Sequence, residues 1–426
     1  MVSEVEEKGK QSMAIQAPKG TKDILPEQSG KWQYIEQFFR EICKTYGFSE
    51  IRTPMFEHTE LFVRGVGDTT DVVEKQMYSF QDLQGRDVTL KPEGTSPVVR
   101  ALIENGLYAQ MQPTKLYYIT PCFRYENTQK GRYRQFHQLG IEVFGAENPL
   151  ADAEIVSLAA NLFQKLNLTE IELQVNSVGC PNCRPKHREA LKDFLRDKYD
   201  NLCEDCKGRY ERNPMRILDC KKKGCQEQVK DAPLMLDYLC EDCALHFQTF
   251  QKILQTMGIK FTVNPWIVRG LDYYTKTAFE FVSTRKLAQG TVCGGGRYDN
   301  LAEEIGGPHI PGVGFGLGIE RLLFMLEEEG VSLPEQSETD YVVIAMGEEA
   351  CYFAIALTER LRKNGRSVQM DMMGRNVKNQ FKYADKIGGK KAIIIGDQEL
   401  ADQLLQIKDM ETGEQKEIPF SEIEKL

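Results

Sequence analysis

Two arginines occur in local settings that suit the binding of a phosphate or a carboxylate. Arg124 ends a strand-like run and precedes the cation-rich loop N-T-Q-K-G-R-Y-R, whereas Arg269 lies in V-R-G-L-D-Y-Y beside two tyrosines. A guanidinium keeps its charge, and its planar fork contacts two oxygens at once. The simpler alternatives are a solvated hairpin around Arg124 and a structural ion pair between Arg269 and an acid such as Asp272.

The strand-like runs on the two sides of this loop, residues 114–126 and 134–144, carry polar residues at even spacing. Glu126 lies two residues after the strand arginine, and Gln138 and Glu142 follow on the second run. Side chains two residues apart on a strand share a face. The pattern therefore predicts one polar surface that combines an arginine, carboxylates and an amide.

The segment K-P-E-G-T-S at residues 91–96 places a carboxylate in a turn. Glu93 follows a proline and stands beside backbone N–H groups, so it could hold an ammonium group. The simpler alternative is a helix start that is capped by Thr95 or Ser96.

Glycines gather at Gly294–Gly296 and Gly312–Gly318, ahead of Glu320 and Arg321. Glycines let a strand approach a bulky ligand, and Arg321 opens a helix that could point at a phosphate. No G-K-[ST] follows, which excludes a P-loop. No β-α-β unit with a ribose-binding acid surrounds these glycines, which excludes a dinucleotide fingerprint.

Eight of the twelve cysteines lie between Cys180 and Cys243, a clustering that favours metal over disulfides in a reducing compartment. They form four close pairs: Cys180 with Cys183, Cys203 with Cys206, Cys220 with Cys225, and Cys240 with Cys243. Three arrangements of these pairs are possible. We favour a nested one, in which the two outer pairs bind one structural zinc and the two inner pairs bind another. Eight reduced thiols packed as small apolar groups are the alternative.

The bulk properties indicate a cytoplasmic protein of two or three domains, given 426 residues. No apolar run approaches the roughly 18 residues needed to cross a bilayer, so we expect no membrane association. The first residues lack the apolar core of a signal peptide, and residues 1–17 are expected to be a disordered extension, with translation starting at Met1 or Met13. The net charge of −9 argues against a globally basic nucleic-acid binder but not against a local RNA-binding patch.

The elements that must position these residues divide the chain at a few places. Residues 18–329 alternate strand-like and helical patterns, and residues 176–245 form a polar, helical, Cys-rich insertion, since strand-like sequence resumes at Phe261. Residues 330–339 are a linker by composition. Residues 340–426 follow a β-α-β-α-β pattern, which predicts a small α/β domain with its own core.

Taken together, these segments resemble the three signature motifs of class II aminoacyl-tRNA synthetases. Motif 1 corresponds to the helix over residues 31–46 and the strand that ends at Pro54, motif 2 to F-R-Y-E through R-Q-F-H-Q-L-G-I-E, and motif 3 to G-V-G-F-G-L-G-I-E-R-L. V-R-G-L-D-Y-Y and the early run P-K-G-T-K-D-I-L-P are similar to the histidyl-tRNA synthetase family in particular. The resemblance covers residues 18–426, and the order and spacing of the motifs are more specific than any one of them.

The resemblance implies an α+β catalytic domain with an antiparallel sheet flanked by helices, a homodimer formed through motif 1, and a C-terminal α/β anticodon-binding domain. It implies a histidine–tRNA ligase that activates L-histidine with ATP and Mg²⁺, releases pyrophosphate, and transfers histidine from histidyl-adenylate to the 3′ end of tRNA(His). Positioning and positive charge would carry this chemistry, and activation requires no general base.

The resemblance also assigns roles to individual residues. Arg124 would contact the α-phosphate and the substrate carboxylate, and Arg269 would stabilise charge that develops on the α-phosphate, so these two are the expected catalytic residues. The residues expected to bind histidine are Glu93, Gly94, Thr95, Arg124, Gln138, Glu142, Arg269, Tyr273 and Tyr274. Those expected to bind ATP are Arg124, Glu126, Phe136 and Arg321.

One position departs from the family pattern. At Asn127 the family often has an arginine where the tRNA acceptor end is read, and we expect Gln129 and Arg132 to replace it. Ten cations against two acids between residues 360 and 391 suit a phosphate backbone. Two rival interpretations are a regulatory subunit of ATP phosphoribosyltransferase, a paralogue that lacks the anticodon domain, and an RNA-binding zinc protein with a vestigial ATP site.

Overall fold

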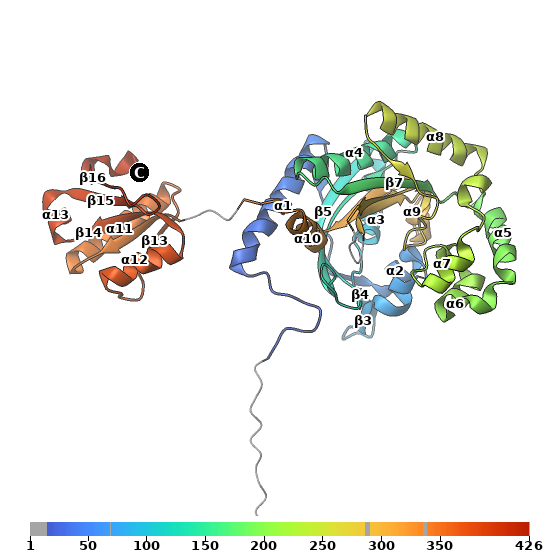
Figure 1. The fold of residues 1–426 in the computed structure, drawn as a ribbon, viewed down its shortest axis with the longest axis horizontal. Helices are drawn as coiled ribbons and strands as arrows, with labels where there is room; N and C mark the ends of the chain where they lie inside the picture. The colour runs from blue at the N-terminus through green and yellow to red at the C-terminus, as the bar shows by residue number, and fades with distance from the viewer. Residues whose placement is uncertain (1–14, 69, 286–289, 335–338, 426) are drawn as a thin grey trace, which may run out of the picture. The chain divides into compact units, whose positions relative to one another are not determined.

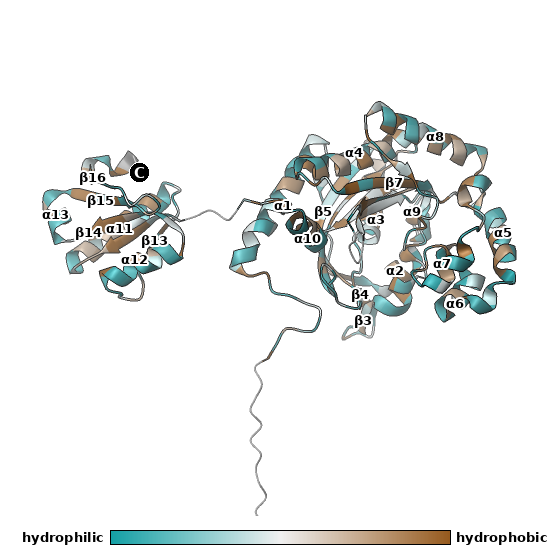
Figure 2. Ribbon diagram, in the orientation of Figure 1, coloured by the Kyte–Doolittle hydropathy of each residue, from teal (hydrophilic) through white to brown (hydrophobic). Residues whose placement is uncertain are grey.

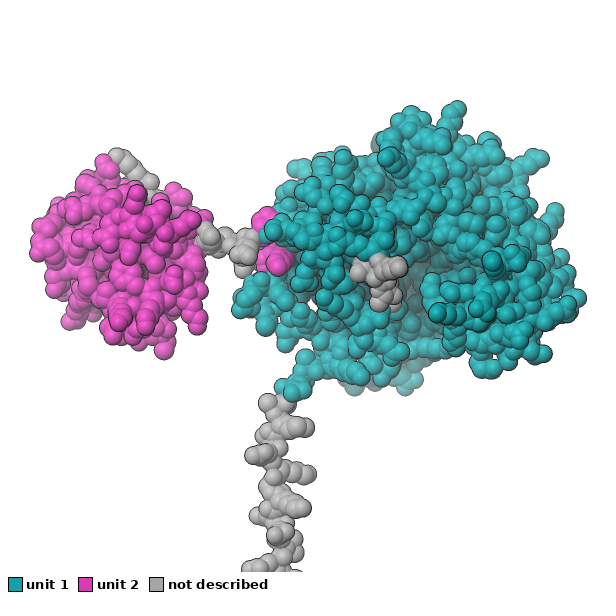
Figure 3. Space-filling view, viewed as in Figure 1, with its two compact units in different colours: residues 1–28, 32–333 teal, residues 29–31, 334–426 magenta. Residues whose placement is uncertain are grey.

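The computed structural model of the chain describes residues 15–68, 70–285, 290–334 and 339–425. It contains two compact units, one of residues 1–28 and 32–333 and one of residues 29–31 and 334–426 (Figure 3). Most of the predicted N-terminal extension, including Met1 and Met13, and residues 335–338 of the predicted linker lie outside the described residues. Within the described part of the chain, no helix is long and apolar enough to span a bilayer.

An eight-stranded sheet forms the centre of the first unit (Figure 1). In spatial order its strands are β1 (Ser49–Glu50), β5 (Thr114–Phe123), β6 (Gln135–Phe144), β11 (Gly312–Gly318), β10 (Thr291–Arg297), β9 (Thr275–Ser283), β7 (Ile171–Ser177) and β8 (Thr262–Val263). The six inner strands pair antiparallel, as expected, whereas β1 and β8 pair parallel at the two edges.

The strand predicted to run up to Pro54 is shorter than the sequence pattern indicates. Only Ser49 and Glu50 belong to β1, and Ile51 adds one further bond from its N–H to the carbonyl of Tyr117 at 2.8 Å. Proline has no N–H to donate, so the ladder cannot continue through Pro54.

Alternation along the strands gives the sheet two different faces. Leu139, Ile141 and Val143 of β6 point into the main hydrophobic core, whereas Gly140 and Glu142 lie on the opposite face. The core face is covered by α1 (Pro26–Thr45), α4 (Pro149–Lys165), α8 (Glu241–Thr256) and α10 (Ile319–Glu328). Figure 2 shows that apolar residues are concentrated in the strands and on the helix faces that meet them.

The opposite face carries shorter elements and a second, smaller core. These are α3 (Thr95–Glu104), α9 (Leu301–Glu304), α2 (Thr59–Val66) and a three-stranded sheet in the order β2 (Phe56–His58), β4 (Asp87–Leu90) and β3 (Tyr78–Gln81). Val98, Val99 and Leu102 of α3 pack against Leu116 and Tyr118 of β5. This packing holds α3 against β5 on this face of the large sheet.

The predicted insertion lies between β7 and β8. It consists of α5 (Arg184–Arg196), α6 (Glu204–Arg212) and α7 (Lys223–Val229), and α8 returns the chain to the large sheet. Figure 2 shows that α5 to α7 are mainly hydrophilic. Leu191, Leu195, Ile217 and Val229 form its own small core together with four buried or half-buried cysteines.

The second unit has the predicted β-α-β-α-β order and a further hairpin. Its elements are β12 (Thr339–Ala345), α11 (Glu348–Lys363), β13 (Val368–Met370), α12 (Val377–Lys386), β14 (Gly389–Ile395), α13 (Asp397–Asp402), β15 (Leu404–Asp409) and β16 (Gln415–Pro419). The strand order is β13-β12-β14-β15-β16, parallel in the first three strands and antiparallel in the last pairs.

Candidate active site

Glycines on the open face of the large sheet make room for the polar side chains of the candidate site. A Cβ at Gly314 would overlap with the carboxyl group of Glu142, and a Cβ at Gly316 would overlap with the amide of Gln138. Both glycines lie on β11, where Gly314 is opposite Glu142 and Gly316 is opposite Gly140 of β6. The glycine-rich stretch is therefore required by close approach of side chains within the site.

Glu142 is the centre of a buried hydrogen-bond network. Its carboxyl group accepts bonds from the hydroxyls of Thr95 (2.8 Å), Tyr118 (3.1 Å) and Tyr298. The side chain is fully buried, and this burial raises its pKa from 4.5 to about 8, although the hydroxyl donors oppose the shift. A cation placed against this carboxyl group would favour its ionised form.

The K-P-E-G-T-S segment contacts the same strand through its backbone and side chains. Gly94 donates its N–H to the Gln138 amide oxygen at 2.9 Å. The Glu93 carboxylate accepts from the N–H groups of Thr95 (2.6 Å) and Ser96 (2.9 Å). The alternative of a helix start capped by Thr95 or Ser96 was therefore wrong about the capping residue. The side chain that satisfies the first N–H groups of α3 is that of Glu93.

Four tyrosines surround the network, of which the sequence analysis singled out two. Tyr273 and Tyr274 are buried with ring centroids 4.7 Å apart, and Tyr298 lies 5.5 Å from Tyr273. Tyr118 and Tyr298 were missed. Tyr118 precedes Arg124 by six residues on a strand, so the even spacing that predicted the polar face could have identified it.

Arg124 and Phe136 lie together at the end of the β5–β6 hairpin. The Arg124 Nε–H donates to the carbonyl of Pro92 at 2.8 Å, and its guanidinium lies 5.4 Å from the Phe136 ring centroid. The predicted hairpin is therefore not simply solvated, since its arginine is held between the turn before α3 and an aromatic face.

Arg269 pairs with an acid that the sequence analysis did not identify. Its guanidinium forms an ion pair with Glu280 of β9 and lies 5.4 Å from the Tyr274 ring centroid, while Asp272 accepts a bond from the Asn213 amide at 2.9 Å. A Cβ at Gly294 would overlap with the Arg269 guanidinium. Arg269 has a φ of 56°, a backbone conformation that residues other than glycine rarely adopt.

The other residues that were predicted to bind ATP or the tRNA acceptor end lie in the loop between β5 and β6 and at the start of α10. Glu126 is buried and forms an ion pair with Arg132, and the backbones of Gln129 and Arg132 form an isolated bridge. Arg321 donates to the carbonyl of Thr291, and burial lowers the pKa of its guanidinium.

A cavity of about 670 Å³ separates the sheet from the insertion. Arg269, Glu280 and Thr291 line its sheet side. Residues of the insertion, including Asp219 and Lys221, line the other side. This volume falls in the range of clefts that bind small-molecule ligands.

The structure brings the cysteines together in the nested arrangement. Cys180, Cys183, Cys240 and Cys243 form one group, and Cys203, Cys206, Cys220 and Cys225 form the other. In the second unit, several of the ten predicted cations have partners within the domain: Arg362 donates to the carbonyl of Val368, Lys363 lies 3.9 Å from Glu359, and Arg375 pairs with Asp371.

Comparisons with known proteins agree with this fold and identify the family. A family model described as histidyl-tRNA synthetase matches residues 20–322, and one described as an anticodon binding domain matches residues 340–426. The histidine–tRNA ligase of Caldanaerobacter subterraneus is 56% identical over 413 residues, which are 97% of this chain and 99% of the relative. That of Clostridium perfringens is 55% identical over 407 residues, 95% of this chain and 97% of the relative.

Among solved structures, apo histidyl-tRNA synthetase from S. aureus matches with a TM-score of 0.83 and 41% identity, covering 96% of this chain and 99% of that one. The sheet, the two glycine-lined strands and the motif order define an aminoacyl-tRNA synthetase fold of class II. Within that class, the chain belongs to the histidyl-tRNA synthetase family.

Proposed function

We propose that this protein activates L-histidine with ATP and transfers it to the 3′ end of tRNA(His). The observation that carries the proposal is the buried carboxyl group of Glu142 among hydroxyl donors, on a glycine-lined face of the large sheet. Family membership supports the same reaction, since the relatives are named for it.

At the histidine end, Glu142 and Gln138 offer oxygens that can accept from the ammonium or imidazole N–H groups of the substrate. Tyr273 and Tyr274 offer flat ring faces against which an imidazole can pack, and hydroxyls that can hydrogen-bond to it. Glu93, Gly94 and Thr95 would bound the histidine site on the α3 side, where Gly94 donates its N–H to the Gln138 amide oxygen.

At the ATP end, positioning and positive charge carry the reaction. Arg124 would hold the substrate carboxylate against the α-phosphate, and Arg269 would stabilise negative charge as it develops there. The carboxylate oxygen forms a bond to the α-phosphorus while the bond from that phosphorus to the β-phosphate bridge oxygen breaks, so that pyrophosphate leaves. Phe136, Glu126 and Arg321 would position adenine and the γ-phosphate, and Mg²⁺ bound to ATP neutralises phosphate charge.

In the second half-reaction, the terminal ribose hydroxyl of tRNA attacks the carbonyl of histidyl-adenylate and AMP leaves. Gln129 is exposed and Arg132 is half-buried in the loop between β5 and β6, and both would contact the acceptor end. The second unit would contact the anticodon, and a homodimer formed through motif 1 in the cytoplasm is part of the proposal.

Histidine-dependent exchange of pyrophosphate into ATP tests the proposal directly. We expect exchange with histidine and none above background with other amino acids. Exchange with another amino acid but not with histidine would overturn the substrate assignment. An absence of exchange with all amino acids, combined with histidine binding, would favour the regulatory-subunit alternative.

A further inference from the structure

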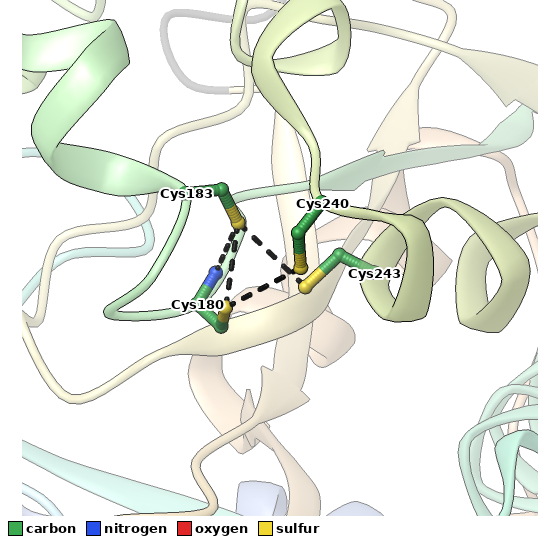
Figure 4. Close-up of side chains that lie close together, drawn as sticks. All are labelled: Cys180, Cys183, Cys240 and Cys243. Carbon is green, nitrogen blue, oxygen red and sulfur yellow. Dashed lines mark hydrogen bonds between the residues drawn. The ribbon is translucent and has the colours of Figure 1, made fainter.

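The eight cysteines of the insertion lie in two compact groups whose sulfurs converge. In the outer group, the Sγ atoms of Cys180 and Cys183 are 3.4 Å apart, those of Cys180 and Cys240 are 3.8 Å apart, and those of Cys183 and Cys243 are 3.7 Å apart (Figure 4). Within each group, all four sulfurs lie within 4.8 Å of one another. The groups are therefore similar in size although their residues come from different elements.

These separations suit one metal ion in each group better than disulfides. A disulfide requires an S–S distance of about 2.05 Å, and all eight residues are free thiols. Four thiolates at about 2.3 Å from a tetrahedral zinc lie about 3.8 Å from one another. An iron–sulfur cluster would spread its thiolates over several irons and hold them further apart. We propose that the insertion binds two structural zinc ions, an outer one at Cys180, Cys183, Cys240 and Cys243 and an inner one at Cys203, Cys206, Cys220 and Cys225.

The local backbone favours thiolates at both sites. Cys183, Cys203 and Cys240 immediately precede α5, α6 and α8, so their sulfurs lie near the positive ends of helices. The N–H of Cys180 points to the Cys183 sulfur at 3.1 Å, and that of Cys203 points to the Cys225 sulfur at 3.2 Å. Such N–H donors orient thiolate ligands and reduce their charge.

The outer site joins the insertion to the segment that carries the pocket tyrosines. Cys180 and Cys183 follow β7, and the next residue, Arg184, donates to the carbonyls of Val178 (3.1 Å) and Tyr274. Cys240 precedes α8 and Cys243 lies in its first turn, and His246 of the same helix bonds to Thr277 of β9 at 3.2 Å. An ion at this site would therefore hold β7, α5 and α8 in a fixed relation to the residues around Tyr274.

The inner site holds together the part of the insertion that faces the cavity. Its small apolar core is built around α5, α6 and α7, and Cys220 lies in the cavity wall between Asp219 and Lys221. A core of this size supplies little folding energy alone, and a structural metal commonly provides the rest. The two ions would thus have separate structural roles, one at the base of the insertion and one at its head.

Metal analysis of the purified full chain tests the stoichiometry. We expect about two zinc ions per chain, released in proportion as a mercurial reagent blocks the thiols. Less than about one metal ion per chain, with all eight thiols reactive in the folded protein, would overturn the proposal. Iron with acid-labile sulfide in place of zinc would also overturn it. This measurement needs no variant and does not depend on histidine-dependent exchange, so its failure leaves the proposed reaction untouched.

Paired variants test the nested assignment. C240S/C243S and C203S/C206S should each retain about one zinc ion, whereas the control C351S, at an exposed cysteine of the second unit, should retain about two. Hydrogen exchange should increase around Arg184 and Tyr274 in the first variant and in α6 and α7 in the second. If either double variant retained both ions, or if exchange increased in the same segments for both, the assignment of the two sites would be wrong.

Discussion

The Thr95 hydroxyl donates a 2.8 Å hydrogen bond to Glu142, which joins the start of α3 to a central strand across the floor of the site. Burial raises the pKa of Glu142 from 4.5 to about 8. Between these two pH values, the carboxyl group is therefore protonated in the folded chain and ionised in the unfolded chain. The stability that this proton contributes is complete below about pH 4.5 and is lost as the pH rises through about 8.

We therefore expect the free energy of unfolding to decrease between about pH 5 and 8, with up to about 1.4 kcal/mol per pH unit from this group. Glu142→Gln should remove that part of the slope, because glutamine does not titrate. Denaturant unfolding of the parent chain and of Glu142→Gln at several pH values measures the difference between their slopes. The other titrating groups contribute equally to both slopes and cancel. Equal slopes would mean that Glu142 is ionised in the folded chain throughout this range.

Gly314→Ala tests the close approach that explains the glycine-rich strand. The added Cβ would overlap with the Glu142 carboxyl group and the carbonyl of Ile141, so we expect a loss of about 1–3 kcal/mol in unfolding free energy and weaker histidine binding. Gly224→Ala is the matched control, because a Cβ there meets no atom within 4 Å and lies in α7. Equal stability of the two variants would contradict the packing argument.

How much of this site was predictable depended on how local its signals are. Gln138 and Glu142 were identified because a strand repeats every two residues, and the motif order then identified the family. Glu280, the partner of Arg269, was missed because it lies 11 residues further along the chain, on β9, and no local pattern predicts that the segment before β9 folds back onto that strand. The three-stranded sheet and the β15–β16 hairpin were also missed, since short, mostly exposed strands leave little hydrophobic alternation.

The nested cysteines were a different case. Recurrent spacing indicated metal ligands but left three pairings open, and the favoured nested pairing joins the two ends of the insertion, which requires these ends to lie close together. The structure supplies that geometry, because β7 and β8 are neighbours in the sheet. A pairing of this kind depends on where the chain returns, which no short motif encodes.

Arg269→Ala separates a chemical role from a structural one. We expect histidine-dependent pyrophosphate exchange to fall by about 10³-fold while circular dichroism and the unfolding midpoint stay close to those of the parent chain. The variant keeps the same strained backbone, since alanine also carries a Cβ at this φ. Glu280→Gln is the control, because it removes the ion pair but keeps the guanidinium. Equal losses in both variants would assign Arg269 to structure alone.

Asp152 and Arg297 form a fully buried ion pair behind the site, and it should dominate acid stability. Burial alone would raise the Asp152 pKa, but Arg297 and the His246 hydrogen bond outweigh it and lower that pKa from 3.8 to about 2. The stabilisation is thus complete above about pH 3.8 and is lost as the pH falls through about 2.

Asp152→Asn should lower the unfolding free energy at neutral pH by about 3–5 kcal/mol, because it leaves a buried guanidinium without its main partner. Asp193→Asn, which removes an exposed pair with Arg196, should cost less than about 1 kcal/mol. Thermal and denaturant unfolding measure both values. A small effect of Asp152→Asn would mean that Asp299, which also contacts Arg297, compensates for the loss.

Lys382→Glu tests whether the basic face of the second unit contacts RNA. Lys382 is exposed on α12, next to Tyr383, whereas Lys416 is exposed on β16 outside the predicted basic segment. If α12 lies against the tRNA backbone, Lys382→Glu should raise the KM for tRNA several-fold. It should also reduce the slope of log binding constant against log salt concentration by about one, since one fewer counterion is released on binding. Histidine-dependent pyrophosphate exchange should be unchanged, since that step needs no tRNA. Lys416→Glu should leave both quantities near the parent values, and an equal rise in KM for the two variants would indicate a general charge effect in place of a contact at α12.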